Sequence, residues 1–317
     1  CIRDSSSPII RAINGKNNRY GYPKNILHPS MIYLFLSIVC ASLIFVLFRS
    51  FSNYRVDTFL AIVINYSAAA ILGFLVSDEP FNLSALLAES WMLNALILGG
   101  SFIGSFYLMA ITAQRLGASV ASVANKMAVI VPVLFAFWLY NDSITYPKVI
   151  GIALALFGLF WATKKEKINQ TKRQWLLPLS LFLVSGLLDT FVKHTQQQHF
   201  TEGSSTGLFI PTLFATAAII GWGILLLNSN KIRTMKKATL LGGLILGGVN
   251  FLSITFIFKA LAHENMESSV VFPINNMGVV LFTSLFSYFI FKERLSKLNL
   301  AGLAICLAAI ALIAWGI

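Results

Sequence analysis

The sequence LILGG stands at Leu96–Gly100 and again at Leu244–Gly248, and this repetition decides the fold. Beyond it the two halves of the chain continue to match at a nearly constant offset, which aligns Asn125 with Asn276. Self-similarity at a fixed spacing is the sequence sign of a duplicated structural unit. The chain therefore contains one unit used twice, and its composition tells what kind of unit it is.

Composition excludes a water-soluble fold for most of the chain. Hydrophobic residues make up 57% and charged residues only 11%, and the mean hydropathy is +0.76. A helix crosses the hydrocarbon core of a bilayer with roughly 20 apolar residues, and such stretches follow one another from Met31 onward. We predict ten membrane spans, at residues 31–48, 58–76, 92–112, 118–138, 149–163, 175–193, 206–227, 238–261, 269–290 and 298–317.

Ten spans in two copies give five spans per copy. Because five is odd, two copies joined end to end enter the bilayer with opposite orientations. The predicted fold is an all-α integral membrane protein, with ten transmembrane helices arranged as two inverted five-helix repeats. The first repeat covers residues 31–163, a basic linker covers 164–174, and the second repeat covers 175–317. Residues 1–30 are polar and aperiodic, so we expect a non-native or disordered leader and exclude it from the fold.

The basic residues are concentrated in every second loop between the predicted spans. Lys148 is essentially the only cation in the loops after even-numbered spans. The loops after odd-numbered spans hold Arg49, Arg55, Arg115, Lys164, Lys165, Lys167, Lys172, Arg173, Lys231, Arg233, Lys236, Lys237, Lys292, Arg294 and Lys297. Basic loops stay on the cytoplasmic side of a membrane. The charges therefore predict that the odd-numbered loops are cytoplasmic and that Met31 and Ile317 lie outside.

The formal charge of +12 has the same explanation. Basic loops of membrane proteins face anionic lipid. A nucleic-acid partner is not expected, because no basic cluster is interleaved with exposed aromatic residues on a soluble domain. The expected partners are the lipid bilayer of the cell's inner, cytoplasmic membrane and a small-molecule substrate. Proton or ion coupling and a homodimer are both compatible with this interpretation.

Two turn motifs extend the internal match. Pro132 is followed by Asp142 and by Gly151, and in the second half Glu293 and Gly302 stand at the equivalent places. With the five-plus-five repeat, this pattern resembles the drug/metabolite transporter superfamily, specifically its ten-span EamA-type permeases. The resemblance implies a secondary carrier of small organic solutes, often an exporter, and it favours cytoplasmic termini, against the charge argument. The sequence departs from the family pattern in span nine, where Thr283 stands at the position at which the pattern has proline.

Polar residues deep in the spans are the candidates for a site, because an amide or a charge facing lipid is costly. They fall in equivalent stripes of the fourth and ninth spans, with Pro132 and Pro273 as the expected helix kinks. One interpretation is a substrate cavity at the bilayer midplane between kinked helices. The other is close helix packing held by interhelical hydrogen bonds. The candidate cavity residues are Ser122, Asn125, Lys126, Asn275, Asn276 and Thr283.

Charged residues within spans form a second group of candidates. Asp189 and Lys193 are one turn apart in span six, which suits either a local ion pair or a gate or coupling pair. Lys126 is aligned with the uncharged Met277, so symmetry does not require its charge. We expect Lys126 to be the functional cation of the cavity, with Asp189 as its protein partner. The alternative is a lysine that extends its ammonium group through a crevice to water.

The sequence predicts no metal, no cofactor and no enzymatic activity. It contains no GxxxxGK[ST] loop for ATP hydrolysis, and the pair His263-Glu264 lacks the second histidine of a zinc helix. The function predicted is secondary transport of small organic metabolites, amino-acid-like or related, by alternating access. The alternatives are a membrane enzyme acting on lipid-linked substrates and a membrane scaffold or sensor. We also expect Gly100xxxGly104 and Gly243xxxGly247 to be close helix contacts.

Overall fold

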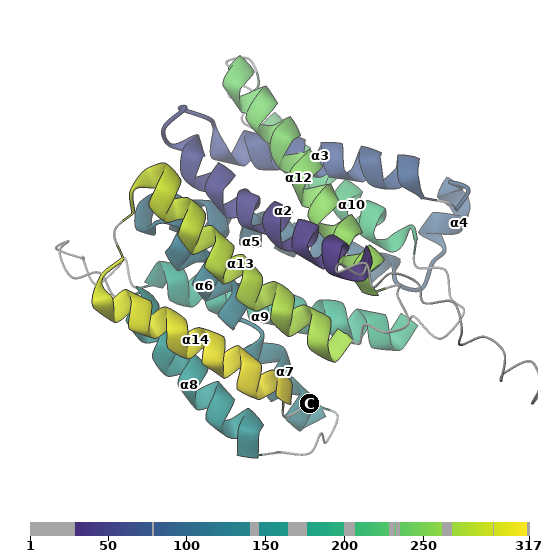
Figure 1. Ribbon diagram of the computed structural model, residues 1–317. Helices are drawn as coiled ribbons and strands as arrows, with labels where there is room; N and C mark the ends of the chain where they lie inside the picture. Colours follow the sequence, from purple (N-terminus) through teal and green to yellow (C-terminus); the bar gives the residue numbers. More distant parts are fainter. Residues whose placement is uncertain are drawn as a thin grey trace, which may run out of the picture.

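The computed structural model describes residues 29–77, 79–139, 146–163, 176–199, 207–227, 232, 235–261, 268–293 and 295–315. The regular elements in these ranges are all helices (Figure 1). Their bounds are α2 Pro29–Phe51, α3 Thr58–Val76, α4 Leu83–Leu87, α5 Met92–Leu116, α6 Ala118–Met127, α7 Ile130–Leu139, α8 Tyr146–Thr163, α9 Leu176–His199, α10 Phe209–Leu226, α12 Lys237–Leu261, α13 Ser268–Phe291 and α14 Lys297–Trp315.

Each predicted span falls on a helix, and the fourth span falls on two, α6 and α7. Six helices are long and apolar enough to cross a membrane: α2, α3, α5, α10, α12 and α13. The remaining four spans contain shorter apolar helical segments. The prediction of an all-helical membrane fold is therefore confirmed. The arrangement as ten spans in two inverted repeats stays a prediction, and residues 1–28 lie outside the described residues.

Two helices, α8 and α14, lie side by side along one flank of the molecule (Figure 1). Small residues bring their backbones together, since a Cβ atom at Gly158 would stand 2.9 Å from the Cys306 nitrogen. Gly302 packs in the same way on the backbone of Ala162. The Asn299 side-chain amide donates a hydrogen bond of 3.1 Å to the Ala162 carbonyl oxygen. In a membrane, close approach of this kind replaces the hydrophobic effect as the source of helix association.

Helices α3 and α12 form a second close pair, which joins the two halves of the chain. Cβ atoms at Gly243 and Gly247 would stand only 2.8 Å and 2.7 Å from the carbonyl oxygens of Ala61 and Asn65. The side-chain amides of Asn65 and Asn250 share a buried hydrogen bond of 3.2 Å. The prediction of a close contact at Gly243xxxGly247 is therefore confirmed.

The corresponding prediction for Gly100xxxGly104 is wrong. A Cβ atom at Gly104 would meet nothing within 4 Å, and one at Gly100 would make only an ordinary contact with Ile220. The glycine that packs tightly is Gly99, against Thr216 of α10. The α5 helix therefore presents to α10 a face that is rotated by one residue from the face that the GxxxG spacing indicates.

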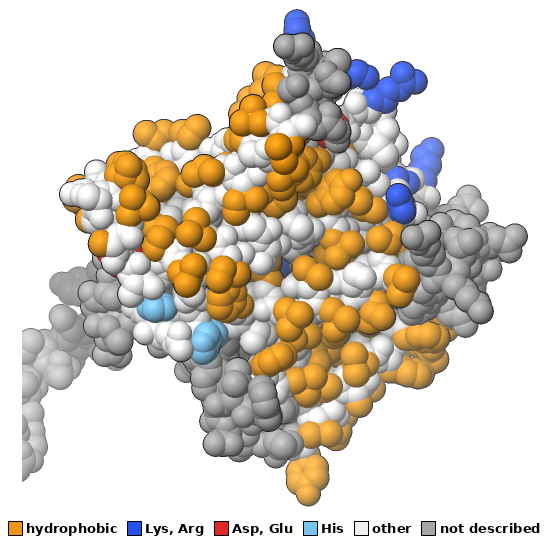
Figure 2. Space-filling model, turned by 180° about the vertical axis from the view of Figure 1, so that it is seen from behind, with side chains coloured by type: hydrophobic (Ala, Val, Ile, Leu, Met, Phe, Trp, Pro, Cys, Tyr) orange, Lys and Arg blue, Asp and Glu red, His pale blue; other side chains and the backbone are white. Residues whose placement is uncertain are grey.

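The charged side chains gather at the ends of the molecule. Figure 2 shows apolar residues over the middle of one face, Lys and Arg at one end and two His at the opposite end. The first end, named here the basic end, is where α2 and α13 finish and where α3, α6, α12 and α14 begin. Apolar middles and charged ends are expected of helices that cross a bilayer.

Candidate functional site

The fourth span is broken near its middle. Helix α6 ends at Met127, the next two residues form a turn, and α7 begins at Ile130. Pro132 explains the break, because proline lacks the amide hydrogen and its ring clashes with the carbonyl of the residue four positions earlier, which is Ala128. At the break the regular helical hydrogen bonds give way to tighter turn bonds, from the Ala128 amide to the Asn125 carbonyl oxygen at 3.2 Å and from the Val131 amide to the Ala128 carbonyl oxygen at 2.9 Å. Such half-helix ends can bind polar or charged groups inside a membrane protein.

Helix α9 covers this break. The Asn125 side-chain amide donates a hydrogen bond of 2.9 Å to the Ser185 hydroxyl. The next residue, Gly186, packs against the Val131 side chain, and a Cβ atom at this position would stand 2.9 Å from the Ala128 carbonyl oxygen. Only a residue without a side chain lets α9 approach the turn between α6 and α7 so closely. The contact therefore fixes α9 across the interrupted helix.

Two charged side chains meet at the same place. Lys126 is half-buried in the last turn of α6, where the partial negative charge of a helix end favours a cation. Asp189 lies one turn beyond Ser185 on α9 and interacts electrostatically with Lys126. Asp189 is exposed on α9, so the charged pair lies where a polar solute could reach it.

The other predicted cavity residues are distributed over several contacts. Ser122 is fully buried and donates to the Ser119 carbonyl oxygen at 2.9 Å. Asn275 is buried on α13, where its side-chain oxygen accepts from the Ser37 hydroxyl at 3.3 Å. The Thr283 hydroxyl is fully buried and has no hydrogen-bond partner among the described residues. These three side chains are thus buried within the helix packing, and Ser122 lies one helical turn before Lys126 on α6.

Helices α6 and α13 pack together in opposite directions. The start of α6 meets the end of α13, because Gly117 contacts the Glu293 carboxylate, and further along the hydroxyls of Ser119 and Ser284 are 2.8 Å apart. At a rise of about 1.5 Å per residue, the half-buried Asn276 lies at a depth similar to that of the end of α6. The polar residues of the two halves thus lie at similar depth on two helices that pack together.

Helix α13 differs from its repeat counterpart. It continues from Ser268 to Phe291 through residue 273 without an interruption. The side chains of Pro273 and Lys193 lie outside the described residues. The helix break is thus present in the first half alone among the described parts of these two spans.

A group of contacts at the basic end joins the two halves of the chain. The Arg49 guanidinium donates to the Glu293 carboxylate at 3.1 Å and to the Gln114 carbonyl oxygen at 3.0 Å. It also lies over the Phe291 ring, 5.7 Å from the ring centre. We call this set of contacts the latch. It connects the end of α2, the junction of α5 with α6, and the turn between α13 and α14.

The backbone on both sides of the latch has unusual geometry. Gly117 has a φ of 106°, which favours glycine, and a Cβ atom there would stand 2.7 Å from a Glu293 carboxylate oxygen. Lys292 has a φ of 51°, and the Glu293 amide donates to the Ser287 carbonyl oxygen at 3.2 Å. The turn after α13 is thus shaped so that Glu293 points back toward α2 and α6.

The opposite end has its own contacts between the halves. The His199 ring at the end of α9 is 2.9 Å from the Ser90 hydroxyl and 3.2 Å from the Asn94 amide. The Gly207 amide donates to the Glu79 carboxylate at 2.9 Å. The two halves of the chain are thus joined by polar contacts at both ends of the molecule.

Comparison with known proteins matches residues 28–164 with the EamA-like transporter family. This stretch, which covers α2 through α8, is similar to the family. An uncharacterized protein of Haemophilus influenzae is 26% identical over 284 residues, which cover 87% of this chain and 95% of that protein. A solved crystal structure covers 90% of this chain and 96% of its own, with a TM-score of 0.57 at 14% identity. This last likeness shows a shared fold and nothing more.

The family match confirms the resemblance predicted from the repeat and the turn motifs. The EamA-like unit includes α2 through α8, and hence the broken helix, Asn125 and Lys126. The family is one of membrane transporters of small solutes. Together with the six apolar helices, it identifies a multi-pass membrane protein of the transporter class.

Two functional candidates of this EamA-like protein were missed from sequence. Ser185 stands four residues before Asp189, so the polar stripe of span six could have been extended back by one turn to find it. The partnership of Arg49 with Glu293 had no comparable signal. Arg49 was interpreted by its loop charge and Glu293 as part of a turn motif, and the two lie 244 positions apart in the sequence.

Proposed function

We propose that this protein is a secondary transporter of small organic solutes, which bind beside the charged pair at the α6–α7 break. The observation that carries the proposal is the interrupted helix α6–α7, which has Lys126 in the last turn of α6 and Asp189 of the covering helix α9 near enough for the two charges to interact. Charges inside membrane proteins are costly, and those that are kept usually mark a substrate or ion path. A solute with its own carboxylate and ammonium groups, as amino acids have, complements such a pair.

The proposed mechanism is alternating access. In the conformation described, the latch ties α2, α6 and the turn after α13 at the basic end, which closes that side. Asp189 is exposed in this conformation. Opening at the basic end would require the Arg49–Glu293 ion pair to separate. The loop charges support a cytoplasmic location of this end, and hence insertion in the cytoplasmic membrane.

The test begins with the solute. Cells that overproduce the protein and cells that lack it are compared for sensitivity to amino acids, their toxic analogues and related metabolites, and for release of these compounds. The first compound that responds is then used as a radiolabelled probe in proteoliposomes that contain the purified protein. Uptake of the probe is the measured quantity.

The decisive variant is Lys126→Met, which copies Met277 of the second repeat and removes a costly charge. We expect normal insertion and folding, because no short hydrogen bond of Lys126 is lost among the described residues. Transport should fall roughly 10–150-fold, the range for loss of a hydrogen bond to a charged group. Asp189→Asn should impair transport in the same way.

Lys259→Met is the matched control. This lysine is also on a predicted span, but it is exposed on α12 and lies over the Tyr33 ring, 5.7 Å from its centre. The control should transport at nearly the wild-type rate. Wild-type uptake by well-expressed Lys126→Met protein would show that the pair is structural and would refute the proposed site.

A further inference from the structure

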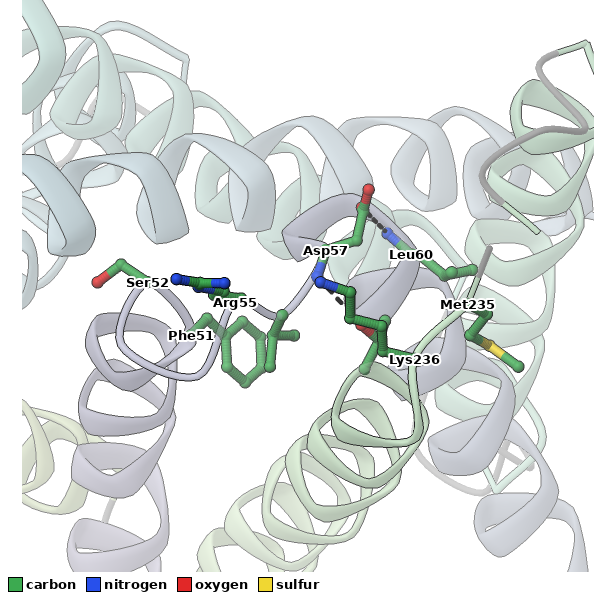
Figure 3. Close-up of a pocket in the computed structure, with 9 residues that line it drawn as sticks. Phe51, Ser52, Arg55, Asp57, Leu60, Met235 and Lys236 are labelled. Carbon is green, nitrogen blue, oxygen red and sulfur yellow. Dashed lines mark hydrogen bonds between the residues drawn. The ribbon is translucent and has the colours of Figure 1, made fainter. Parts of the chain in front are cut away.

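A pocket of 440 Å³ lies at the basic end, apart from the α6–α7 break. Figure 3 shows it between the turn that joins α2 to α3 and the start of α12. Arg55 comes from the turn and Lys236 from the residue before α12, so both halves of the chain contribute a cation. Both side chains are exposed, and neither has an ion-pair partner among the described residues.

Four of the other seven residues that line the pocket are apolar. Phe51 and Leu60 line it and are themselves buried in the helix packing, while Val56 is half-buried. Met235 is 39% exposed at the pocket edge. The pocket therefore offers positive charge at its rim and apolar surface below, which suits a ligand that is itself amphipathic.

Three groups in the pocket can donate hydrogen bonds to an anion. The Thr239 hydroxyl accepts from the Asp57 backbone amide at 3.1 Å, which leaves its own hydrogen for donation. The Arg55 guanidinium and the Lys236 ammonium supply the other donors. The carboxylate in the pocket wall, that of Asp57, accepts from the Leu60 amide at 3.0 Å as the N-cap of α3, and in Figure 3 it points away from Arg55 and Lys236.

We propose that this pocket binds the phosphate group of an anionic membrane lipid. The ends of membrane-spanning helices lie at the level of the lipid head groups. At this pocket α2 finishes, and α3 and α12 begin. A water molecule occupies about 30 Å³ of liquid, so the pocket has room for a glycerol phosphate and the beginning of an acyl chain. Arginine and lysine are the side chains that bind phosphate most strongly in proteins.

Native mass spectrometry of the purified, delipidated protein in detergent tests this proposal. Phosphatidylglycerol and, separately, phosphatidylcholine are titrated into wild type and into the double variant Arg55→Gln/Lys236→Gln. Each basic residue near an anionic membrane contributes about fivefold to binding, so the pair should contribute about 30-fold. We expect one phosphatidylglycerol to bind wild type in preference to phosphatidylcholine, and its affinity to fall by that factor in the double variant.

The control is Arg115→Gln/Lys297→Gln, which removes two exposed cations from the same end but outside the pocket. It should bind phosphatidylglycerol like wild type. Equal weakening in both double variants would mean that net charge alone attracts the lipid, and no weakening in the pocket variant would mean that the pocket does not bind it. Either result would overturn the proposal. Should the pocket variant aggregate, Lys236→Gln alone makes the same comparison with an expected fivefold effect.

A second arm separates the two sources of phosphate. Inorganic phosphate and glycerol phosphate are added at millimolar concentration to the complex with phosphatidylglycerol. Retention of the lipid supports a site that needs both the head group and the chain. Displacement of the lipid by either soluble phosphate would overturn the lipid assignment and identify the pocket as a site for soluble phosphate compounds.

Discussion

Separating the latch should open the basic end of the protein. The perturbation is Arg49→Gln and Glu293→Gln, made singly and together. The charged atoms are 3.1 Å apart, and the two side chains are only 28% and 18% exposed. Glutamine keeps the length and polarity of both positions approximately, so the change removes mainly the charges and the ion pair.

The size of the effect follows from this geometry. At 3.1 Å and an effective dielectric constant of about 20, the attraction is roughly 5 kcal/mol, from which the desolvation of both ions is subtracted. Fully exposed pairs retain only about 0.2–1 kcal/mol. For this partly buried pair we expect about 1–3 kcal/mol, which corresponds to a shift of roughly 5–150-fold in the ratio of open to closed protein.

The assay measures access from the basic end. Cys40 and Cys306 are replaced by alanine and Cys1 by serine, and a single cysteine is introduced by Ser122→Cys. Ser122 is fully buried on α6, near the latch. The rate of labelling by a membrane-impermeant maleimide, added from the basic side in proteoliposomes, then reports the open population. Either latch variant should raise this rate by the factor given above.

The double variant provides the refutation. If Arg49 and Glu293 act as one pair, labelling of the double variant should be no faster than that of either single variant. An unchanged labelling rate would show that the pair does not hold the closed state, and additive effects would show that the residues act independently. Lys297→Gln removes an exposed cation from the same end and should leave the rate unaltered.

Three further predictions test packing and orientation. Gly186→Ala should cost about 1–3 kcal/mol through overpacking at the α6–α7 break, whereas Gly223→Ala, which meets nothing within 4 Å, should leave thermal unfolding in detergent nearly unchanged. Asn250→Ala should cost roughly 0.6–1.7 kcal/mol, the range for interhelical hydrogen bonds in membranes, by removing the partner of Asn65. A periplasm-active reporter fused after Ile317 should be active, and activity of a cytosolic reporter there instead would reverse the orientation inferred from the loop charges.

The helices of this protein were predictable because lipid leaves the backbone few choices. An apolar stretch in a bilayer must satisfy its own hydrogen bonds, and a helix does this within one segment. Pro132 likewise predicted the position of the break, because a proline disturbs the carbonyl of the residue four positions before it. Position 273, also a proline, does not interrupt its helix. It stands in the second turn of α13, where losing one amide hydrogen affects only a bond near the helix start.

The sequence did not allow us to predict which helix faces contact one another. The spacing Gly100xxxGly104 marks a surface that can approach another helix, but it does not say whether a helix is there. The small neighbour Gly99 serves that contact instead. In the same way Asn275 and Asn125 occupy nearly equivalent places, yet one bonds to α2 and the other to α9. Partners depend on the whole arrangement of helices and not on the local pattern.

The pairing of α8 with α14 has a consequence for biosynthesis. The Asn299 amide donates to the Trp161 carbonyl, 138 residues earlier in the chain. During translation, α8 therefore enters the membrane long before the helix that covers its glycine-containing face. Until α14 is made, that face has to be shielded by lipid or by the insertion machinery. The period between the synthesis of these two helices is thus when the nascent protein is most open to mispairing and to degradation by membrane quality control.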